Sequence, residues 1–510
     1  MLTALVFLPA LGALLLLLLP NELMRGTSPR ATMGREATRG PSTRATTGLA
    51  TKLGAAAVTL ADLALALCLW ARFDTTSTGV QFAEKQLWVP GLNIHYFLGI
   101  DGLSLPMVLL TTLLGFLAVL ISWNIEHRVK LYFAVLLILE TGILGVFTAL
   151  DFVLFFLFWE VELLPMFLLI AVWGSPPPLG RREYSAWKFL LYTFFGSAFM
   201  LMGLLALYWS SGSFNLIELR EMDLTRTTVP AALIFWSIFL AFAIKLPVFP
   251  FHTWLPDAHT DAPTAASVIL AGVLLKMGGY GMVRICISLF PDVAAAWAPV
   301  LALFAVVNVL YGALLTLRQT DLKRLVAYSS VSHMGYVLLG LAALGEVGMT
   351  GAVLQMFTHG TITGLLFALV GLVYDKTHTR QIPELRGLAH RMPFVATVFG
   401  IAALASLGLP TMSGFVAEFL VFAGTYPAFG AYTVLGTAGV VLAAAYMLWV
   451  VERSFFQTTS RHLHEVRDAT LLERVAPAAL VASIMVVGLW PRVLLDVIKT
   501  GLGPILARLG

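Results

Sequence analysis

The sequence predicts an all-α membrane protein that crosses the bilayer about 14 times. Of its 510 residues, 59% are hydrophobic and only 12% are charged. Apolar runs of about 18 or more residues recur along the whole chain, which is the pattern of membrane-spanning helices. Helices are required because backbone amides in lipid must form hydrogen bonds within their own segment, and no strand pattern predicts a barrel.

The apolar runs set the expected order of the spans. We place them at residues 2–20, 52–71, 103–123, 131–150, 152–173, 186–208, 230–249, 264–288, 296–316, 325–343, 350–373, 393–409 running on to 424, 430–452 and 471–491. A tight turn at Asp151 must join the fourth and fifth spans. The first run lacks a basic start and a cleavage site, which predicts a retained helix rather than a signal peptide. The stretch 22–50 is rich in Arg, Thr, Ser and Gly, and we expect a mobile basic loop there.

Basic residues indicate the orientation of the chain. Of the 32 Lys and Arg residues, 22 fall in or beside the odd-numbered loops and 8 in the even-numbered loops and the C-terminal tail. Because cytoplasmic loops carry the excess of basic residues, both termini are expected on the non-cytoplasmic side. The net charge of +4 follows from this asymmetry, and we expect no nucleic acid partner.

Composition also excludes several kinds of site on this chain. Its only cysteines are Cys68 and Cys286, too few for a disulfide framework, a cysteine-ligated zinc site or an iron–sulfur cluster. The sequence contains no Gly-rich dinucleotide motif after a strand and no Walker loop. We therefore expect no metal and no cofactor on this chain. Any redox or ATP-driven chemistry must lie on another chain.

Weak internal repetition relates the sixth and eleventh spans. They align at an offset of 168 residues, which matches four pairs: Thr193 with Thr361, Gly196 with Gly364, Phe199 with Phe367 and Gly203 with Gly371. The seventh and twelfth spans each contain an interrupting proline, Pro247 and Pro410. Paired broken helices in corresponding halves mark ion or substrate sites in transporters. Because the offset is an odd number of spans, five, the two halves have inverted topology. The alternative to an ion or substrate site is that the proline kinks serve only helix packing.

Lys245 and Lys276 lie inside runs that are long enough to cross a membrane. A lysine at the bilayer centre costs roughly 2.5–3.5 kcal/mol, so such residues indicate a path for ions or protons. Lys245 directly precedes the helix break. Burial destabilises the charged form of Lys245, whereas a nearby carboxylate stabilises it. A closed ion pair can therefore hold the proton on Lys245, and an open ion pair can release it. The alternative for Lys245 is a snorkelling anchor.

Acidic residues supply the candidate partners. Glu160 and Glu162 are roughly 200° apart on an ideal helix, so only one of them can face the path and the other faces a neighbour. Glu140 either faces a partner chain or makes a satisfied contact between helices. Glu418 follows Pro410 by eight residues and completes the set.

Histidines provide further proton-transfer candidates. His333 and His359 lie among serine and threonine hydroxyls that can order water for proton hopping, although a lone helix histidine is more often a satisfied core residue. Neither has the ligand spacing of a metal site. A separate cluster in the stretch after the seventh span contains His252, Asp257, His259 and Asp261. It is either a proton entrance or a polar cap on two helix ends, and we favour the cap.

Several long motifs resemble the antiporter-like membrane subunits of respiratory complex I and of multisubunit cation/proton antiporters. They are FAIKLPVFPFHTWLPDAHTDAP, ILAGVLLKMGGYGMVRI, DLKRLVAYSSVSHMGYVLLG and LASLGLPTMSGFVAEFLVF. Two more, GIDGLSLPMVLLT and LFFLFWEVELLPMFLLIAVWG, resemble the M-type chain specifically. The second acid of WEVELLP is similar to chains of the photosynthetic complex, which takes electrons from ferredoxin, so NADH and ferredoxin both stay open as donors.

The resemblance implies a fourteen-helix fold with two inverted five-helix repeats. The corresponding domains are 1–130, 131–289 for helices 4–8, 290–452 for helices 9–13, and 453–510. It implies a proton channel in which Glu160 pairs with Lys245, Lys276 is the central lysine, and His333 and His359 follow. Glu418 matches the glutamate that separates M-type chains from sister subunits, which have lysine there.

The resemblance also implies a setting and partners. We expect a multi-pass protein of a bacterial cytoplasmic or thylakoid membrane, bound to sister antiporter-like chains and small subunits. Quinone, flavin and iron–sulfur clusters are expected on partner subunits, and protons are the expected cargo. The predicted function is proton translocation in an NAD(P)H or ferredoxin:quinone oxidoreductase. A subunit of a cation/proton antiporter is the alternative, and a scaffold whose charges only hold helices together is the third.

Overall fold

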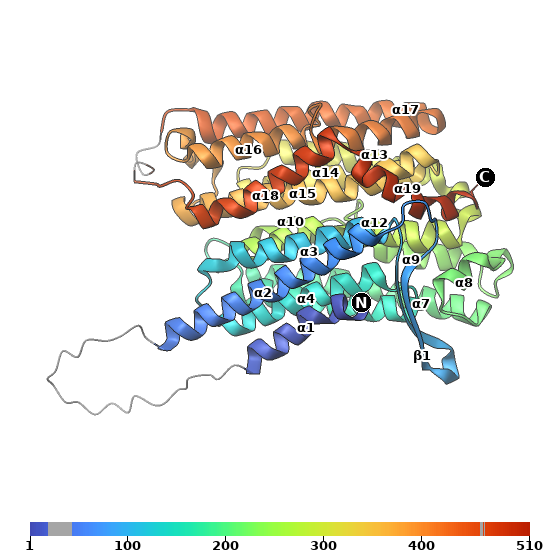
Figure 1. Ribbon diagram of the computed structural model, residues 1–510. Coiled ribbons are helices and arrows are strands. Elements are labelled where there is room, and N and C mark those ends of the chain that lie inside the picture. Colours follow the sequence, from blue (N-terminus) through green and yellow to red (C-terminus); the bar gives the residue numbers. More distant parts are fainter. Residues whose placement is uncertain (19–42, 460–462, 464, 510) are drawn as a thin grey trace.

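Long helices lie side by side across the whole molecule (Figure 1). The computed structural model describes residues 1–18, 43–459, 463 and 465–509. Within these residues, eleven helices are long and apolar enough to cross a membrane, and three shorter apolar helices are α1, α9 and α16. The all-α membrane fold is therefore confirmed. The stretch expected as a basic loop lies outside the described residues over 22–42, and 43–50 belong instead to a helix.

The first half of the chain contains twelve of the helices. They are α1 (Leu2–Leu18), α2 (Thr43–Arg72), α3 (Ser104–Ile121), α4 (Val129–Thr148), α5 (Phe152–Val161), α6 (Leu163–Trp173), α7 (Arg182–Ser211), α8 (Leu216–Glu221), α9 (Ala231–Lys245), α10 (Trp254–Asp261), α11 (Thr264–Ile269) and α12 (Leu275–Gly281). Asp151 makes the predicted tight turn, because its carboxylate accepts hydrogen bonds from the first backbone N–H groups of α5.

The second half contains longer and less interrupted helices. They are α13 (Pro291–Leu317), α14 (Leu322–Ala342), α15 (Glu346–Thr377), α16 (Pro393–Ser406), α17 (Ser413–Val451), α18 (Leu471–Leu489) and α19 (Arg492–Leu506). Helix α17 kinks at Phe429 and covers the end of the twelfth predicted span and all of the thirteenth. Two π-helical segments, Leu270–Leu274 and Met282–Ile287, flank α12, and such segments are frequent at functional sites.

A two-stranded antiparallel hairpin corrects the expectation of a fold without strands. Strand β1 (Gln81–Val89) pairs with β2 (Ile94–Ile100), and the turn between them closes at Asn93, whose φ is +54°. We missed the hairpin because it lies in a loop between two apolar runs. There the short strand β1 mixes hydrophobic and polar residues without the long apolar run by which we placed elements.

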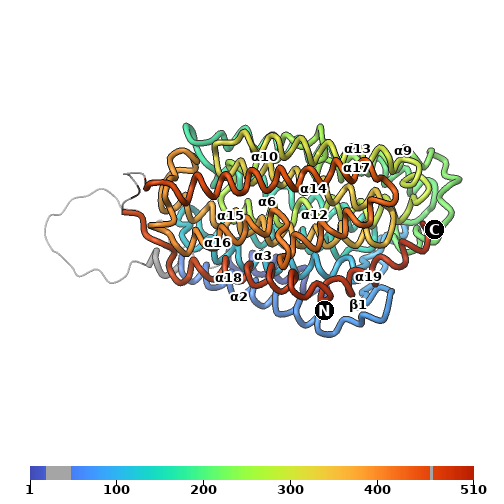
Figure 2. The backbone as a smooth tube through the Cα atoms, turned by 90° about the horizontal axis from the view of Figure 1, so that it is seen from above, coloured from blue at the N-terminus to red at the C-terminus, as the bar shows by residue number. Residues whose placement is uncertain are grey.

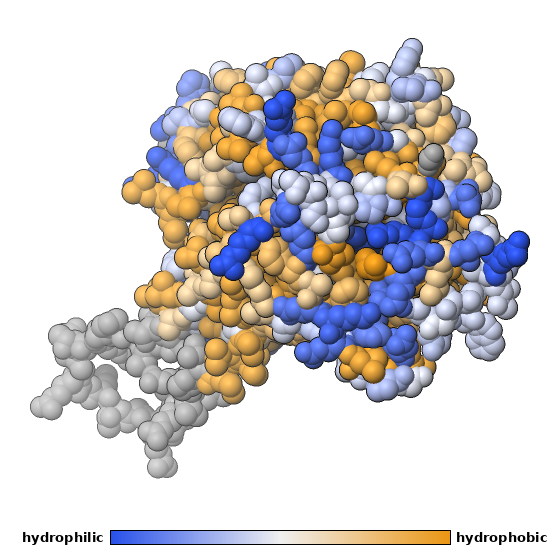
Figure 3. Space-filling model, turned by 45° about the vertical axis from the view of Figure 1, so that its right-hand side comes forward, coloured by the Kyte–Doolittle hydropathy of each residue, from blue (hydrophilic) through white to orange (hydrophobic). Residues whose placement is uncertain are grey.

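The hairpin marks one end of the helix bundle. Both ends of the described chain lie at this end, with α8 and α19 (Figures 1 and 2). When this side is turned forward, hydrophilic side chains gather on it among hydrophobic ones (Figure 3). The two termini therefore share one side of the bundle.

Both predicted proline interruptions are true breaks, and the first was placed correctly at Lys245. Helix α9 ends there, the chain unwinds over residues 246–253, and α10 then continues the polar stretch that we expected to be a loop. That expectation was wrong because a proline interrupts a helix only locally. The chain becomes helical again at Trp254, after eight non-helical residues. The second break lies between α16 and α17, where Gly408 has a φ of +78°.

A buried ion pair ties the hairpin end to the π-helical segment after α12. Both terminal nitrogens of Arg284 donate hydrogen bonds of 2.6 Å to the carboxylate of Asp101, which directly follows β2. Burial alone would raise the pKa of Asp101. The Arg284 guanidinium and backbone N–H donors outweigh burial and hold that pKa below its usual value.

Candidate functional site

A buried ion pair joins Lys245, at the end of α9, to Glu162. The Lys245 ammonium donates to Glu162 Oε1, and both side chains are almost completely removed from solvent. The rings of Trp159 and Phe189 lie 5.2 and 5.7 Å from the Lys245 nitrogen. This aromatic wall excludes water and adds a cation–π attraction to the ammonium.

The pairing predicted for Glu160 is corrected by this geometry. Glu160 is half-buried and forms no ion pair with Lys245. The choice of Glu160 came from the family resemblance, and the structure places Glu162 against the lysine instead. The helix is interrupted at Glu162, between α5 and α6. Pro165 cannot donate to the carbonyl of Val161, which accounts for the break. Only one of the two acids faces the lysine, as predicted, and that acid is Glu162.

Lys276 lies at the centre of the bundle and contacts the second half directly. Its ammonium donates to the carbonyl of Ala271 and lies 2.7 Å from His359 Nδ1. The carbonyl is available because the chain around Ala271 is π-helical. Helix α12 also packs closely on α9, since a Cβ at Gly278 would lie 2.7 Å from the Phe242 carbonyl oxygen.

The two histidines and Glu418 continue from Lys276. The rings of His359 and His333 are 5.6 Å apart, and His333 Nδ1 lies 3.3 Å from Glu418 Oε1. On its other side, His333 Nε2 lies 3.3 Å from the Ser406 hydroxyl. These groups line a cavity of about 10 Å³, which holds about one water. Gly408 makes room for Glu418, because a Cβ there would lie 2.7 Å from Glu418 Oε2.

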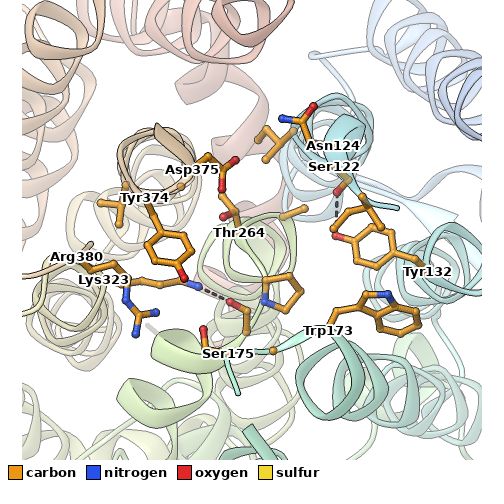
Figure 4. Close-up of a pocket in the computed structure, with 18 of the residues that line it drawn as sticks. Ser122, Asn124, Tyr132, Trp173, Ser175, Thr264, Lys323, Tyr374, Asp375 and Arg380 are labelled. Carbon is orange, nitrogen blue, oxygen red and sulfur yellow. Dashed lines mark hydrogen bonds between the residues drawn. The ribbon is translucent and has the colours of Figure 1, made fainter. Parts of the chain in front are cut away.

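A larger polar cavity of about 470 Å³ opens at the end of the bundle opposite the hairpin. Figure 4 shows Lys323, Tyr374 and Arg380 on one side of it and Tyr132 and Trp173 on the other. Lys323 donates to the carbonyl of Ala262 and is buried. The odd-numbered loops, which carry most of the basic residues, close this end of the bundle. We call this cavity the vestibule.

His259 lies between the vestibule and the central lysine. It is completely buried on α10, its ring stacks on Phe367, and neither ring nitrogen has a hydrogen-bond partner among the described residues. Both Lys323 and Lys276 act on it electrostatically. This arrangement extends the row of buried basic groups from Lys276 to the vestibule.

The remaining predicted residues lie outside this row. Asp257 pairs with Lys188 at 2.7 Å and, more loosely, with Arg324, as a polar cap would. His252 is buried against Phe249 and Tyr311. Asp261 accepts hydrogen bonds from the Ser185 hydroxyl and the Arg181 backbone. The contacts of Asp257 and Asp261 are those of a polar cap, whereas His259 of the same cluster lies in the buried row.

Glu140 is buried within the chain, over Gly115 of α3, which favours the helix contact of its two alternatives, although its Oε1 has no hydrogen-bond partner among the described residues. Asp62 of α2, also completely buried, acts on it electrostatically. We missed Asp62 because a single acid in a moderately apolar run resembles a solvent-facing residue. We also counted Lys323 and Arg284 with the loops, although both are buried in the fold.

Comparison with known proteins agrees with this geometry. The model of the family "NADH:quinone oxidoreductase/Mrp antiporter, TM" matches residues 149–445. NADH-quinone oxidoreductase subunit M of Rhodobacter capsulatus is 42% identical over 463 residues, 88% of each chain. NAD(P)H-quinone oxidoreductase chain 4 1 of Synechococcus elongatus is 46% identical over 444 residues, 85% of this chain and 82% of that one.

Solved structures show the same fold. A chain of respiratory complex I from Thermus thermophilus with bound NADH matches with a TM-score of 0.85, at 29% identity and over 100% of both chains. A chain of the Mrp complex from Dietzia matches with a TM-score of 0.81 at 22% identity, over 100% of this chain and 99% of that one, and shows the fold alone.

The fold and the buried row of ionisable groups define an antiporter-like membrane subunit. The chain belongs to the NADH:quinone oxidoreductase/Mrp antiporter family. Within this family it is an M-type, or chain 4, subunit, as its 42–46% identity to subunit M and chain 4 over most of its length shows.

Proposed function

We propose that the chain translocates protons as the M-type membrane subunit of an NAD(P)H:quinone oxidoreductase. Its relatives are named as subunits of such enzymes, and the family and the fold are the same. Redox energy arrives from partner subunits, which hold the flavin, the iron–sulfur clusters and the quinone. Ferredoxin is the alternative donor. The chain lies in a bacterial cytoplasmic or thylakoid membrane beside sister antiporter-like chains, with 14 crossings and both termini outside the cytoplasm.

The observation that carries this proposal is the continuous row of buried groups from Lys276 to Glu418. Lys276, His359, His333 and Glu418 follow one another at distances of 2.7 Å, 5.6 Å between rings and 3.3 Å. Isolated buried charges are costly in a membrane, and such groups are retained where they form proton relays. Three basic groups are followed by one acid, and all four lie close together, so a proton can move along them without any backbone rearrangement.

The Lys245–Glu162 pair acts as the switch of the first half. While the pair is closed, Glu162 stabilises the protonated ammonium of Lys245. When it opens, the desolvated ammonium becomes unstable and gives up its proton. Glu160 is close enough to act on Lys245 electrostatically, and we propose for it a minor, modulating role in this switch. The two inverted repeats, residues 131–289 and 290–452, would then each contain one broken helix next to the path.

The vestibule and His259 provide the cytoplasmic supply. Lys323 faces the vestibule, His259 follows, and Lys276 lies beyond it. The unpartnered ring nitrogens of His259 leave it free to accept a proton on one side and donate on the other. Protons therefore reach the central lysine from the cytoplasm without passing Lys245.

The test is proton pumping by the intact complex in sealed vesicles, with quinone reduction measured in parallel. Lys276→Met should slow proton transfer through this chain by roughly 10²-fold, because it removes one acid–base group of the relay. His259→Leu should slow it as well. Lys499→Met removes an exposed lysine and serves as the control. Normal pumping in Lys276→Met in an assembled complex would refute the proposal.

An alternative function as an Mrp-type cation/proton antiporter subunit is favoured only by the common fold, at 22% identity. Purification of the native complex separates the two. Copurifying quinone-reductase chains support the first function, and a set of small antiporter chains supports the second.

A further inference from the structure

Asn308 of α13 holds the broken helix at the residues that follow Lys245. The residue is completely buried. Its Oδ1 accepts a hydrogen bond of 2.7 Å from the Phe249 backbone N–H, and its Nδ2 donates to the Pro247 carbonyl oxygen at 3.2 Å. Because the helix is interrupted here, these backbone groups lack their usual helical partners. A single side chain therefore satisfies both a donor and an acceptor of the break.

The same amide also reaches the helix that carries His333. Asn308 Nδ2 donates to the Val331 carbonyl oxygen at 3.0 Å, two residues before His333 on α14. One residue further on, the Ser332 hydroxyl donates to the Val309 carbonyl oxygen of α13 at 2.8 Å. Helices α13 and α14 are thus fixed to each other at the level where Asn308 holds the break.

The break also borders an apolar cavity of about 340 Å³, lined mainly by apolar side chains such as Phe199, Trp236 and Phe304 and by residues 248–251 of the break itself. The cavity leaves space beside the break. Toward α7, the hydroxyl of Thr253 at the end of the break lies 2.9 Å from the Tyr192 hydroxyl. The hydrogen bonds of Asn308 fix the middle of the break, at Pro247 and Phe249, to α13 in the second half of the chain.

We propose that Asn308 is a positioning residue that couples the broken helix of Lys245 to the helix of His333. A change in the Lys245–Glu162 ion pair shifts the break, and Asn308 transmits this shift to the backbone of α14. Only an uncharged side chain with both a donor group and an acceptor atom can bind all three backbone groups, which an amide does. The inference rests on the proposed proton relay and adds a link between its two halves.

The test compares variants in the intact complex reconstituted in sealed vesicles, with the ratio of protons pumped to electrons transferred as the readout. Asn308→Leu keeps the approximate volume and removes all three bonds. Asn308→Asp keeps the shape and the acceptor but loses the donors. Thr316→Val is the matched control, since Thr316 is buried on the same helix and its hydroxyl bonds only within that helix, to the Gly312 carbonyl oxygen.

We expect the proton-to-electron ratio to fall by about twofold or more in both Asn308 variants, while quinone reduction continues and Thr316→Val keeps the normal ratio. A residue with a purely structural role would lower the amount of complex and both rates together and leave the ratio unchanged. An unchanged ratio in assembled Asn308→Asp overturns the inference, even if Asn308→Leu fails to assemble. Lys245→Ala, measured alongside, shows which proposal has failed. Normal pumping in Lys245→Ala refutes the relay itself. Lost pumping in Lys245→Ala together with a normal ratio in Asn308→Asp refutes only the coupling.

Discussion

Glu162→Gln is expected to abolish proton pumping by this subunit and to weaken the fold, whereas Glu160→Gln should have a much smaller effect. The reason is that Glu162, rather than Glu160, neutralises Lys245 in the buried pair. Removing one partner of a buried ion pair leaves an uncompensated charge, which costs about 3–5 kcal/mol. Glu160 is half-buried and supports no such pair.

Pumping in vesicles and thermal unfolding of the purified complex measure the two effects. The double variant Glu162→Gln, Lys245→Met removes both charges, so it should regain much of the lost stability while pumping remains absent. That combination separates the energetic role of the pair from its role in proton transfer. If Glu160→Gln stopped pumping and Glu162→Gln did not, the lysine would work with the other acid.

The second large effect is expected at the Asp101–Arg284 pair, which lies away from the relay. Asp101→Asn leaves the Arg284 guanidinium buried without its carboxylate, so unfolding should become easier by about 3–5 kcal/mol. Arg284→Met should cost a similar amount. Neither change touches a group of the proton path, so complexes that still assemble should keep a normal ratio of protons to electrons.

The pH dependence gives this prediction a second test. Because the folded protein holds the pKa of Asp101 below its usual value, the pair contributes its stability above pH of about 4 and loses it as the pH falls further. The difference in unfolding temperature between the wild type and Asp101→Asn should therefore be full at pH 7 and shrink in acid. A difference that stayed constant down to pH 3 would contradict the assignment.

The sequence was sufficient to predict the elements whose cause is local. Long apolar runs require helices in lipid, and prolines beside Lys245 and Glu418 require breaks, so the spans and both interruptions were predicted close to their observed positions. The relay residues, Lys276 in the first half and His359, His333 and Glu418 in the second, were also named from their place in apolar helices.

Features that depend on packing between distant segments were not predictable in this way. The choice between Glu160 and Glu162 depends on which of the two acids lies against Lys245 in the folded chain, and the order of residues along the helix does not tell this. Lys323 and Arg284 sit near helix ends, where a lysine or arginine is usually solvated, and only the fold shows that they are buried. The hairpin escaped because strand pairing joins two segments, of which the first is almost entirely polar or exposed.

The small cavity beside His333, His359 and Glu418 limits how much water can take part in proton transfer there. It has a volume of about 10 Å³, enough for about one water molecule. A file of several waters does not fit between these side chains. In the proposed relay, a proton therefore passes from one side chain to the next directly or through a single water, and the orientation of that water sets which group it donates to.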